Sequence, residues 1–217
     1  MSKNLKQYTS EKIDVSYDVK RCIHAAECVR GLPAVFDTAK RPWVQPGNSA
    51  ADAVVDVVER CPTGALHYTR KDDGLAEKAP EQNRILITPN GPLYVHGDLQ
   101  IEMADNAVAE TRAALCRCGQ SANKPFCDNA HKTAEFTDAG HIAQNSEADV
   151  DPTGLLTITP AKNGPILLRG NFELVSADGQ TLFHGEKAAL CRCGASSNKP
   201  FCDGSHKAIN FTTEAAE

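Results

Sequence analysis

The stretch CRCGASSNKPFCDGSH, residues 191–206, decides the fold, because it gathers three cysteines and a histidine within one short segment. A closely similar stretch, CRCGQSANKPFCDNAH, occupies residues 116–131, so every cysteine and histidine recurs at a constant offset. The repeat continues upstream, where the Ile-Thr-Pro of residues 87–89 returns at residues 158–160. An internal repeat of this length predicts two copies of one small domain.

Short segments rich in β-forming residues and bounded by Pro and Gly precede each cysteine stretch. They predict matching strands in the two repeats over residues 84–88, 93–96, 99–102, 155–159, 166–169 and 172–175. Pro125 and Pro200 can each open a short helix, since proline is tolerated in a first turn. These helices would carry Cys127 and Cys202.

Each repeat offers three thiols and one imidazole, a set that can hold either zinc or an iron–sulfur cluster. Structural zinc sites usually separate paired cysteines by two to four residues, whereas one residue separates the first pair here. A histidine four positions after a cysteine on a helix lies on the same face. The spacing favours a binuclear iron–sulfur cluster, with structural zinc as the alternative, for the candidate ligands Cys116, Cys118, Cys127, His131, Cys191, Cys193, Cys202 and His206.

Residues 191–206 resemble the CDGSH iron–sulfur domain family at every position of its motif, C-x-C-x2-S-x3-P-x-C-D-G-S-H. The resemblance implies a small β-structure with a cluster-bearing loop and helix. It also implies a 2Fe–2S cluster with Cys191 and Cys193 on one iron, and Cys202 and His206 on the other.

The first repeat departs from this motif at Asn129 and Ala130, where the family has Gly and Ser. All four ligand types remain, so we expect cluster binding with altered stability or potential. The single histidine must lose its coordinating proton to bind iron, so acid should compete with the cluster. The family resemblance associates this property with cluster transfer and redox sensing.

Charged residues flank both sites. The basic ones are expected either to screen cluster charge and steer an acidic partner, or to be ordinary solvated charges: Arg117, Lys124, Lys132, Arg192, Lys199 and Lys207. Asp128 and Asp203 are expected to make helix or turn contacts. One carboxylate per site gives no acid–base pair for catalysis.

A third group of cysteines precedes the repeats, with Cys22 and Cys28 in a C-x5-C segment and Cys61 in a Cys-Pro pair. In the bacterial ferredoxin pattern a further cysteine would fall at Ala25, and alanine cannot ligate iron. Three thiolates predict a 3Fe–4S cluster, or a 4Fe–4S cluster with a fourth ligand that is not cysteine. His24, beside the vacant position, is a candidate for that fourth ligand.

Residues 17–68 resemble the divergent single-cluster ferredoxin domains. Cys22, Cys28, Cys61 and Pro62 carry this resemblance, with residues 31–36 as context. Residues 48–60 predict a helix with a capping residue and a valine-rich face, which would deliver Cys61 to the cluster. Trp43 is expected to be part of the core.

Two polar stretches, residues 69–82 and 137–154, predict linkers. They divide the chain into a ferredoxin-like domain (1–70), a first CDGSH domain (83–137) and a second (154–217). The expected fold class is therefore α+β, and we expect the two CDGSH domains to pack as an intramolecular pseudo-dimer. Cores this small gain stability from a bound metal centre.

Composition narrows the function. The chain has 217 residues and a net charge of −5, which disfavours a nucleic-acid partner. No stretch approaches the roughly 20 apolar residues that span a bilayer, so no membrane association is expected. The first 20 residues have no apolar secretory segment, and nine cysteines cannot complete a disulfide framework. These features predict a cytoplasmic, reducing environment.

The leading functional prediction is electron transfer through three centres to an unidentified redox partner protein. The alternative is a cluster donor or redox sensor that acts on an apo-acceptor protein, with a structural zinc protein as the third reading. Because the chain has no nucleophile–base set, phosphate loop or dinucleotide fingerprint, we do not expect an enzyme.

Overall fold

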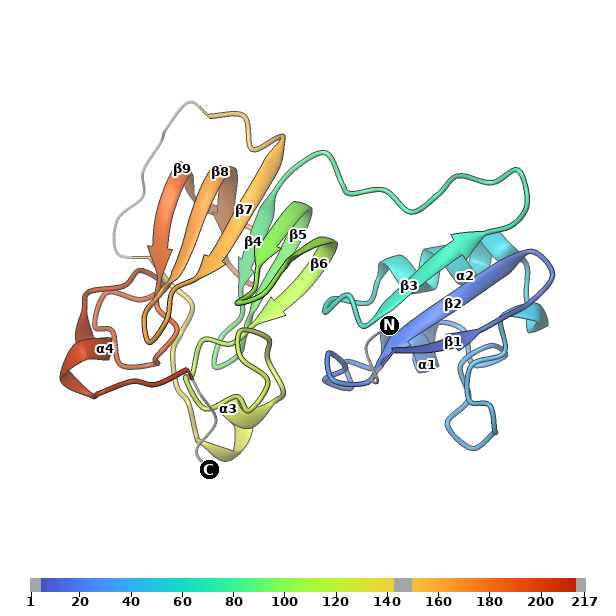
Figure 1. The fold of residues 1–217 in the computed structure, drawn as a ribbon, viewed down its shortest axis with the longest axis horizontal. Helices are drawn as coiled ribbons and strands as arrows, with labels where there is room; N and C mark the ends of the chain where they lie inside the picture. The colour runs from blue at the N-terminus through green and yellow to red at the C-terminus, as the bar shows by residue number, and fades with distance from the viewer. Residues whose placement is uncertain (1–4, 143–149, 214–217) are drawn as a thin grey trace. The chain divides into compact units, whose positions relative to one another are not determined.

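The computed structural model describes residues 5–142 and 150–213, and its contacts divide the chain into two compact units (Figure 1). The first unit is Met1–Lys78 and the second is Ala79–Glu217, which contains both repeats. The described chain is mostly β-structure with few and short helices. The expectation of small strand-rich domains is confirmed at this level.

The first unit is built on a three-stranded antiparallel sheet in the order β1-β2-β3. The strands are β1 (Leu5–Tyr8), β2 (Ile13–Asp18) and β3 (Leu66–Arg70). Along β2 the residues alternate between buried and half-buried, because every second side chain faces the core. Two helices and a 3-10 turn complete the unit: α1 (Glu27–Gly31), η1 (Pro46–Asn48) and α2 (Ala51–Glu59).

Helix α2 forms the other wall of this core, with Ala51, Val54, Val57 and Val58 buried. The predicted helix over 48–60 is confirmed, but it begins later because Pro46–Asn48 forms the 3-10 turn. The helix ends at Glu59, which places Cys61 just beyond its last turn. Trp43 is half-buried and packs against this core, so the expectation for it is confirmed.

The second unit is one six-stranded sheet to which both repeats contribute. In each repeat three antiparallel strands follow one another: β4 (Arg84–Ile87), β5 (Leu93–Glu102) and β6 (Ala107–Leu115), then β7 (Leu155–Pro160), β8 (Ile166–Val175) and β9 (Thr181–Leu190). The six predicted strands are confirmed, and the second and third of each set join into one long strand. Strands β6 and β9, which carry few sequence signals, were not predicted.

The two repeats also pair with each other. Strand β4 lies antiparallel to β5 of its own repeat and parallel to β8 of the other. Strand β7 lies antiparallel to β8 and parallel to β5. Both repeats therefore share one core, whose fully buried members include Leu99, Ile101, Leu156, Ile158 and Phe172.

A fully buried asparagine joins the repeats at this crossing. Asn83 Nδ2 donates to the carbonyls of Gly154 (2.7 Å) and Asn171 (2.8 Å), and its Oδ1 accepts from the amide of Asp98 (3.0 Å). Gly170 is required nearby, because its φ is 113° and a Cβ there would lie 2.2 Å from the Leu155 carbonyl oxygen. The hydrogen bonds of Asn83 and the close approach of the backbone at Gly170 together fix how the two repeats pack against each other.

The short helices that follow the sites differ from the prediction. Helix α3 is Ala130–Thr133 and helix α4 is Ser205–Ala208, so they carry His131 and His206 rather than Cys127 and Cys202. The prolines instead lie in a turn, where the carbonyl of Pro125 accepts from the amide of Cys116. That turn places the prolines several residues before the helices, which is why the helix prediction from Pro125 and Pro200 is wrong.

The predicted linkers also need revision. Strand β3 runs into the first, as far as Arg70, and residues 143–149 of the second lie outside the described residues. At the start of the second stretch, Asp138 contacts the first repeat through Arg117 and Asn90. None of the helices in the described part of the chain has the length and apolar run needed to cross a bilayer.

Candidate metal centres

Each repeated site forms where the last strand of a repeat ends and the chain turns back on itself. Strand β6 ends at Leu115, and the amide of Cys127 then donates to the carbonyl of Ala114 (2.8 Å). The second repeat does the same after β9, with Cys202 donating to Ala189 (2.8 Å). These bonds bring the distant cysteine and histidine beside the adjacent cysteine pair.

The four donors of each repeat lie in two close pairs. In the first repeat, Cys116 Sγ and Cys118 Sγ are 3.7 Å apart, and Cys127 Sγ and His131 Nδ1 are 3.4 Å apart. In the second repeat the corresponding distances are 3.8 Å and 3.4 Å, for Cys191–Cys193 and Cys202–His206. Two ligands bound at about 2.0–2.3 Å to one tetrahedral metal would lie about 3.5–3.8 Å apart. Each pair therefore fits one metal.

Burial shapes the chemistry of these donors. Cys116, Cys118, Cys127 and His131 are all buried, whereas Cys202 and His206 are half-buried. Burial raises the pKa of the Cys127 thiol to about 11 and lowers the pKa of His131. A thiol whose pKa burial has raised stays protonated unless a cation replaces the proton, so a metal centre suits Cys127.

The adjacent cysteines of the first repeat share a proton. The hydrogen bond from Cys118 lowers the pKa of Cys116 to about 6, and the same bond raises the pKa of Cys118. One thiolate is therefore formed near neutral pH before any metal arrives. Such a thiolate is the form that attacks or binds metal.

An aspartate braces each site, as expected for Asp128 and Asp203. Asp128 accepts from the amides of Ala122 (2.8 Å) and Ala130 (3.0 Å), which joins the cysteine loop to helix α3. Asp203 accepts from the amides and the hydroxyls of Ser197 and Ser205. The serine bonds hold the pKa of Asp203 well below its usual range.

Asn129 and Gly204 precede α3 and α4 with φ values of 74° and 90°. The left-handed backbone that the CDGSH glycine provides is thus kept in the first repeat by asparagine, which tolerates it better than most residues. The departure at residue 129 therefore preserves the local geometry.

The flanking arginines are neither solvated charges nor a docking surface. Arg117 and Arg192 are 1% and 3% exposed. Arg117 Nε donates to Gly91 (3.0 Å) and Arg192 Nε to Gly164 (3.0 Å), in the turn that follows the first strand of each repeat. These arginines hold the metal loop against that turn, a role that sequence reasoning missed because an Arg between two ligands looks like a surface charge.

The two loops that carry the cysteine pairs, one from each repeat, contact each other. Cys118 and Cys193 form an isolated antiparallel β-bridge. A Cβ on Gly119 would lie 2.6 Å from the Cys193 carbonyl oxygen, and one on Gly194 would lie 2.7 Å from that of Cys118. Only glycine allows this approach, so one ligand of each site lies at the contact between repeats.

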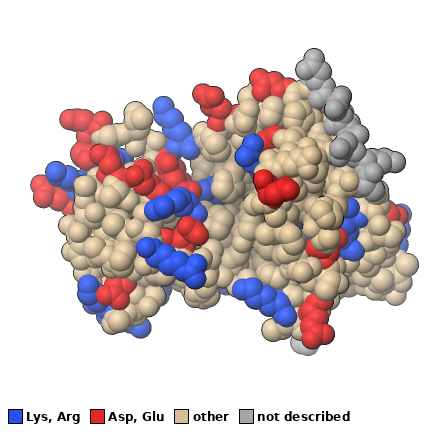
Figure 2. All heavy atoms as spheres, turned by 180° about the vertical axis from the view of Figure 1, so that it is seen from behind, with Lys and Arg blue, Asp and Glu red and all other residues tan. Residues whose placement is uncertain are grey.

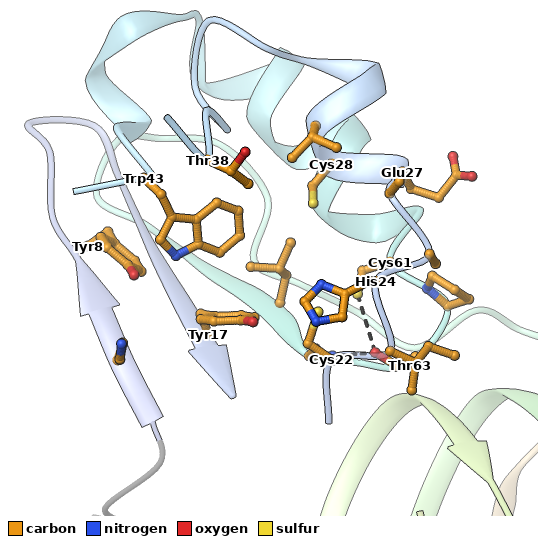
Figure 3. Close-up of a pocket in the computed structure, with 18 of the residues that line it drawn as sticks. Tyr8, Tyr17, Cys22, His24, Glu27, Cys28, Thr38, Trp43, Cys61 and Thr63 are labelled. Atoms are coloured by element: carbon orange, nitrogen blue, oxygen red, sulfur yellow. Dashed lines mark hydrogen bonds between the residues drawn. The ribbon is translucent and has the colours of Figure 1, made fainter. Parts of the chain in front are cut away.

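The amino-terminal cysteines line a cavity of about 620 Å³. Figure 3 shows Cys22, Cys28 and Cys61 there together with Tyr17 and Trp43. Cys28 comes from α1, Cys61 follows α2, and Cys22 follows β2. The structure therefore brings the three predicted ligands to one place.

The surroundings of Cys28 disfavour the ionisation of its thiol. Burial raises the pKa of Cys28 to about 11, and the neighbouring Cys61 and Cys22 add to the rise. The Cys61 sulfur lies 3.6 Å from the Thr63 hydroxyl. Burial raises the pKa of Tyr17, and its hydrogen bond to Cys22 raises that pKa further. Thr63 and Tyr17 are sulfur contacts that sequence reasoning missed.

His24 and Ala25 also belong to the cavity lining. His24 is exposed, and both it and Ala26 have left-handed backbone, with φ values of 57° and 68°. The chain thus curves around the cavity at the position where the ferredoxin pattern lacks its cysteine. Three sulfurs and a roomy, largely apolar cavity fit an iron–sulfur cluster better than a single ion.

One face of the molecule is mixed in charge. Figure 2 shows Lys and Arg interspersed with Asp and Glu on the face that it draws. Charges of both signs at close range partly cancel each other's field.

Comparisons with known proteins agree with this geometry. Residues 8–71 match the family described as divergent 4Fe-4S mono-cluster, and residues 90–132 and 163–207 match the family described as iron-binding zinc finger, CDGSH type. Two curated relatives, each named uncharacterized protein YjdI, come from Escherichia coli strain K12 and Escherichia coli O157:H7. Each is 42% identical over 64 residues, which cover 30% of this chain and 84% of the relative. The chain thus carries iron–sulfur-binding domains of two kinds, and it belongs to the CDGSH iron-binding family, joined to a divergent 4Fe-4S mono-cluster domain.

Proposed function

We propose that the protein binds two 2Fe–2S clusters and one larger cluster and acts in electron transfer. The observation that carries the proposal is the pairing of donors in both repeats. Sulfur–sulfur distances of 3.7 Å and 3.8 Å and sulfur–nitrogen distances of 3.4 Å each suit two ligands on one tetrahedral iron. Two such pairs per repeat suit two irons.

In the first repeat, Cys116 and Cys118 would hold one iron, and Cys127 and His131 the other. The second repeat would use Cys191 with Cys193, and Cys202 with His206. A bound cluster supplies one-electron chemistry. The protein's own residues bury the donors of the first site and the cysteine pair of the second, and they brace the loops through Asp128 and Asp203.

The repeats would act together as an intramolecular pseudo-dimer. The pairing of β4 with β8 and of β7 with β5 supports this arrangement, as does the bridge between Cys118 and Cys193. A ligand from each site at one contact favours electron exchange between the two sites. In this proposal the first CDGSH domain spans residues 83–137 and the second spans residues 154–217.

The amino-terminal domain (1–70) would hold a 3Fe–4S cluster through Cys22, Cys28 and Cys61. A 4Fe–4S cluster would need a fourth ligand, and His24 lines the same cavity. The proposal includes a cytoplasmic location, a redox partner protein, and no nucleic-acid or membrane partner. It assigns no substrate-converting activity.

One observation favours a second function, the transfer of a cluster to an apo-acceptor protein. Cys202 and His206 are half-buried, whereas Cys127 and His131 are buried. The outer iron of the second repeat would therefore be within reach of another protein's thiols. Transfer without net electron flow would favour this function over electron transfer.

The test is total iron and acid-labile sulfide on anaerobically purified protein, with EPR spectra before and after dithionite. We expect roughly seven irons per chain, a signal in the oxidised protein that disappears on reduction, as for one 3Fe–4S cluster, and new signals after reduction, as for two 2Fe–2S clusters. About eight irons and a signal only after reduction would assign four irons to the amino-terminal site. Stoichiometric zinc without sulfide would overturn the proposal.

A further inference from the structure

The two repeated sites are nearly matched in charge. Arg117 and Arg192 occupy equivalent positions, donate to equivalent carbonyls, and stack on Phe136 (5.2 Å) and Phe211 (5.6 Å). Each site also has its aspartate, at residues 128 and 203. These groups carry the same charges at both sites, although Asp203 also accepts from the hydroxyls of Ser197 and Ser205.

A half-buried carboxylate on the first repeat, Asp138, breaks the match. Asp138 accepts from Arg117 Nη1, and its amide donates to Asn90 Oδ1 (2.7 Å). At the equivalent place in the second repeat stands Thr213, whose amide donates to Asn163 Oδ1 (2.9 Å). Within the described residues, Arg192 donates to the backbone carbonyls of Gly164 and Ala161 and has no carboxylate partner.

The extra charge lies close to the first site and is poorly screened. The Arg117 side chain is fully buried and that of Asp138 is 14% exposed. Arg117 stacks on Phe136, whose amide donates to the carbonyl of His131 (3.1 Å). The carboxylate is therefore tied to the segment that carries a ligand of the first site.

Charge reaches across the repeats as well. Cys118 of the first site and Cys193 of the second form a β-bridge, so each site lies close to residues of both repeats. The paired arginines and aspartates therefore cancel in a comparison of the sites. Asp138 remains, together with the exposed Glu135, which has Asn210 at the equivalent position and acts in the same direction.

Reduction adds one negative charge to a cluster, and a nearby negative charge opposes this. We propose that Asp138 sets the two CDGSH sites at unequal reduction potentials, with the higher potential at the second site. This inference depends on the proposed 2Fe–2S clusters. An electron on the first site would then pass to the second. One Fe(II) of the first cluster would be oxidised to Fe(III), and one Fe(III) of the second would be reduced to Fe(II).

The experiment is an EPR-monitored redox titration of full-length protein with a single CDGSH cluster. Cys61→Ala removes the amino-terminal cluster, and Cys202→Ala or Cys127→Ala then leaves the first or the second site alone. We expect the ratio of reduced to oxidised cluster at a fixed potential to be at least tenfold higher at the second site, a difference of about 59 mV for one electron.

Two substitutions test the carboxylate, one by removing it from the first site and one by adding it to the second. Asp138→Asn should raise the potential of the first site, and Thr213→Asp should lower that of the second. Thr213→Asp removes no existing contact of Arg192, so it tests the inference even where Asp138→Asn impairs folding. Asp105→Asn, a change in an exposed turn between β5 and β6, is the matched control and should shift neither potential.

Equal potentials at the two sites, or a Thr213→Asp protein with an unchanged second potential, would overturn the inference. Iron and sulfide analysis of the same samples separates the two levels of the argument. Absence of 2Fe–2S clusters contradicts the proposed function, whereas intact clusters with equal potentials contradict only the role of Asp138.

Discussion

The amino-terminal site and the repeated sites hold their cysteines in different ways. In the repeats, strand ends and turns set the donors in pairs 3.4–3.8 Å apart, close to the spacing on a single metal. In the first unit, Cys22, Cys28 and Cys61 line a cavity of about 620 Å³. The difference shows that in the repeats the backbone itself brings the ligands together. In the amino-terminal unit the ligands surround a cavity that a cluster would fill.

The largest expected effect comes from removing one ligand at a time. Cys61→Ala should remove the three or four irons of the amino-terminal cluster, and Cys127→Ala should remove the two irons of the first repeat. Iron and sulfide per chain measure both losses. Because the units have separate cores, each variant should keep the cluster of the other unit. Loss of all clusters from either variant would contradict this independence.

The next largest effect concerns the contact between metal loops. Gly119→Ala should destabilise the second unit by about 2–4 kcal/mol, since the new Cβ meets a backbone oxygen and φ is +80°. Gly179→Ala is the matched control, with φ of +83° and nothing within 4 Å, and should cost only about 1 kcal/mol. Denaturant unfolding measures both. Equal losses would mean that the loops do not pack as described.

A smaller effect separates the histidine ligand from the cysteines. In a Cys127→Ala background, His206→Cys should slow the acid-driven loss of the remaining CDGSH cluster several-fold, because a thiolate replaces a ligand that protons remove easily. Loss of visible absorbance at about pH 5.5 measures the rate. An unchanged rate would remove His206 from the ligand set.

The smallest effect is a difference in pH dependence between the two units. Protons compete with iron for each thiol, so a raised pKa makes assembly more sensitive to falling pH. The pKa values of Cys28 and Cys127 are both raised to about 11, and that of Cys118 is raised, but the first repeat also has Cys116, whose pKa is lowered to about 6. Reconstitution from about pH 9 to about pH 7 should therefore lose more iron at the amino-terminal site.

Two variants isolate these sites for the pH experiment. Cys127→Ala with Cys202→Ala leaves the amino-terminal cluster alone, and Cys61→Ala with Cys202→Ala leaves the first repeat alone. Iron and sulfide incorporation measure assembly in each. A steeper loss of iron at the first repeat would contradict this prediction. It would mean that the thiols of the amino-terminal cavity bind iron more readily at neutral pH than those at the end of β6.

Much of this arrangement could be predicted from the residues. The constant offset between the two cysteine stretches revealed the repeat, and the valine face of residues 48–60 revealed α2. The helix predicted at Pro125 was wrong, because proline is equally suited to a turn. The positions of β4 and β7 between repeats could not be predicted, since pairing between distant strands leaves no local pattern.

The burial of Arg117 was also beyond sequence reasoning. A guanidinium between two cysteines suggests a solvated charge, and only the carbonyls of Gly91 and Thr88 show that it is part of the core. The sulfur contacts of Thr63 and Tyr17 were hidden for the same reason. Ligand types follow from spacing, but the groups that adjust them depend on the folded chain.

The pairing of β4 with β8 has a consequence for how the chain folds. Arg84 lies opposite Glu173, so a strand made early must wait for a partner that is about 90 residues further along the chain. Contacts this far apart in sequence make folding slow, because a long loop must close before they form. During synthesis, the first repeat would leave the ribosome with an edge of β5 uncovered until β7 follows. A fragment that ends before residue 155 would therefore expose a sheet edge that can pair with another chain.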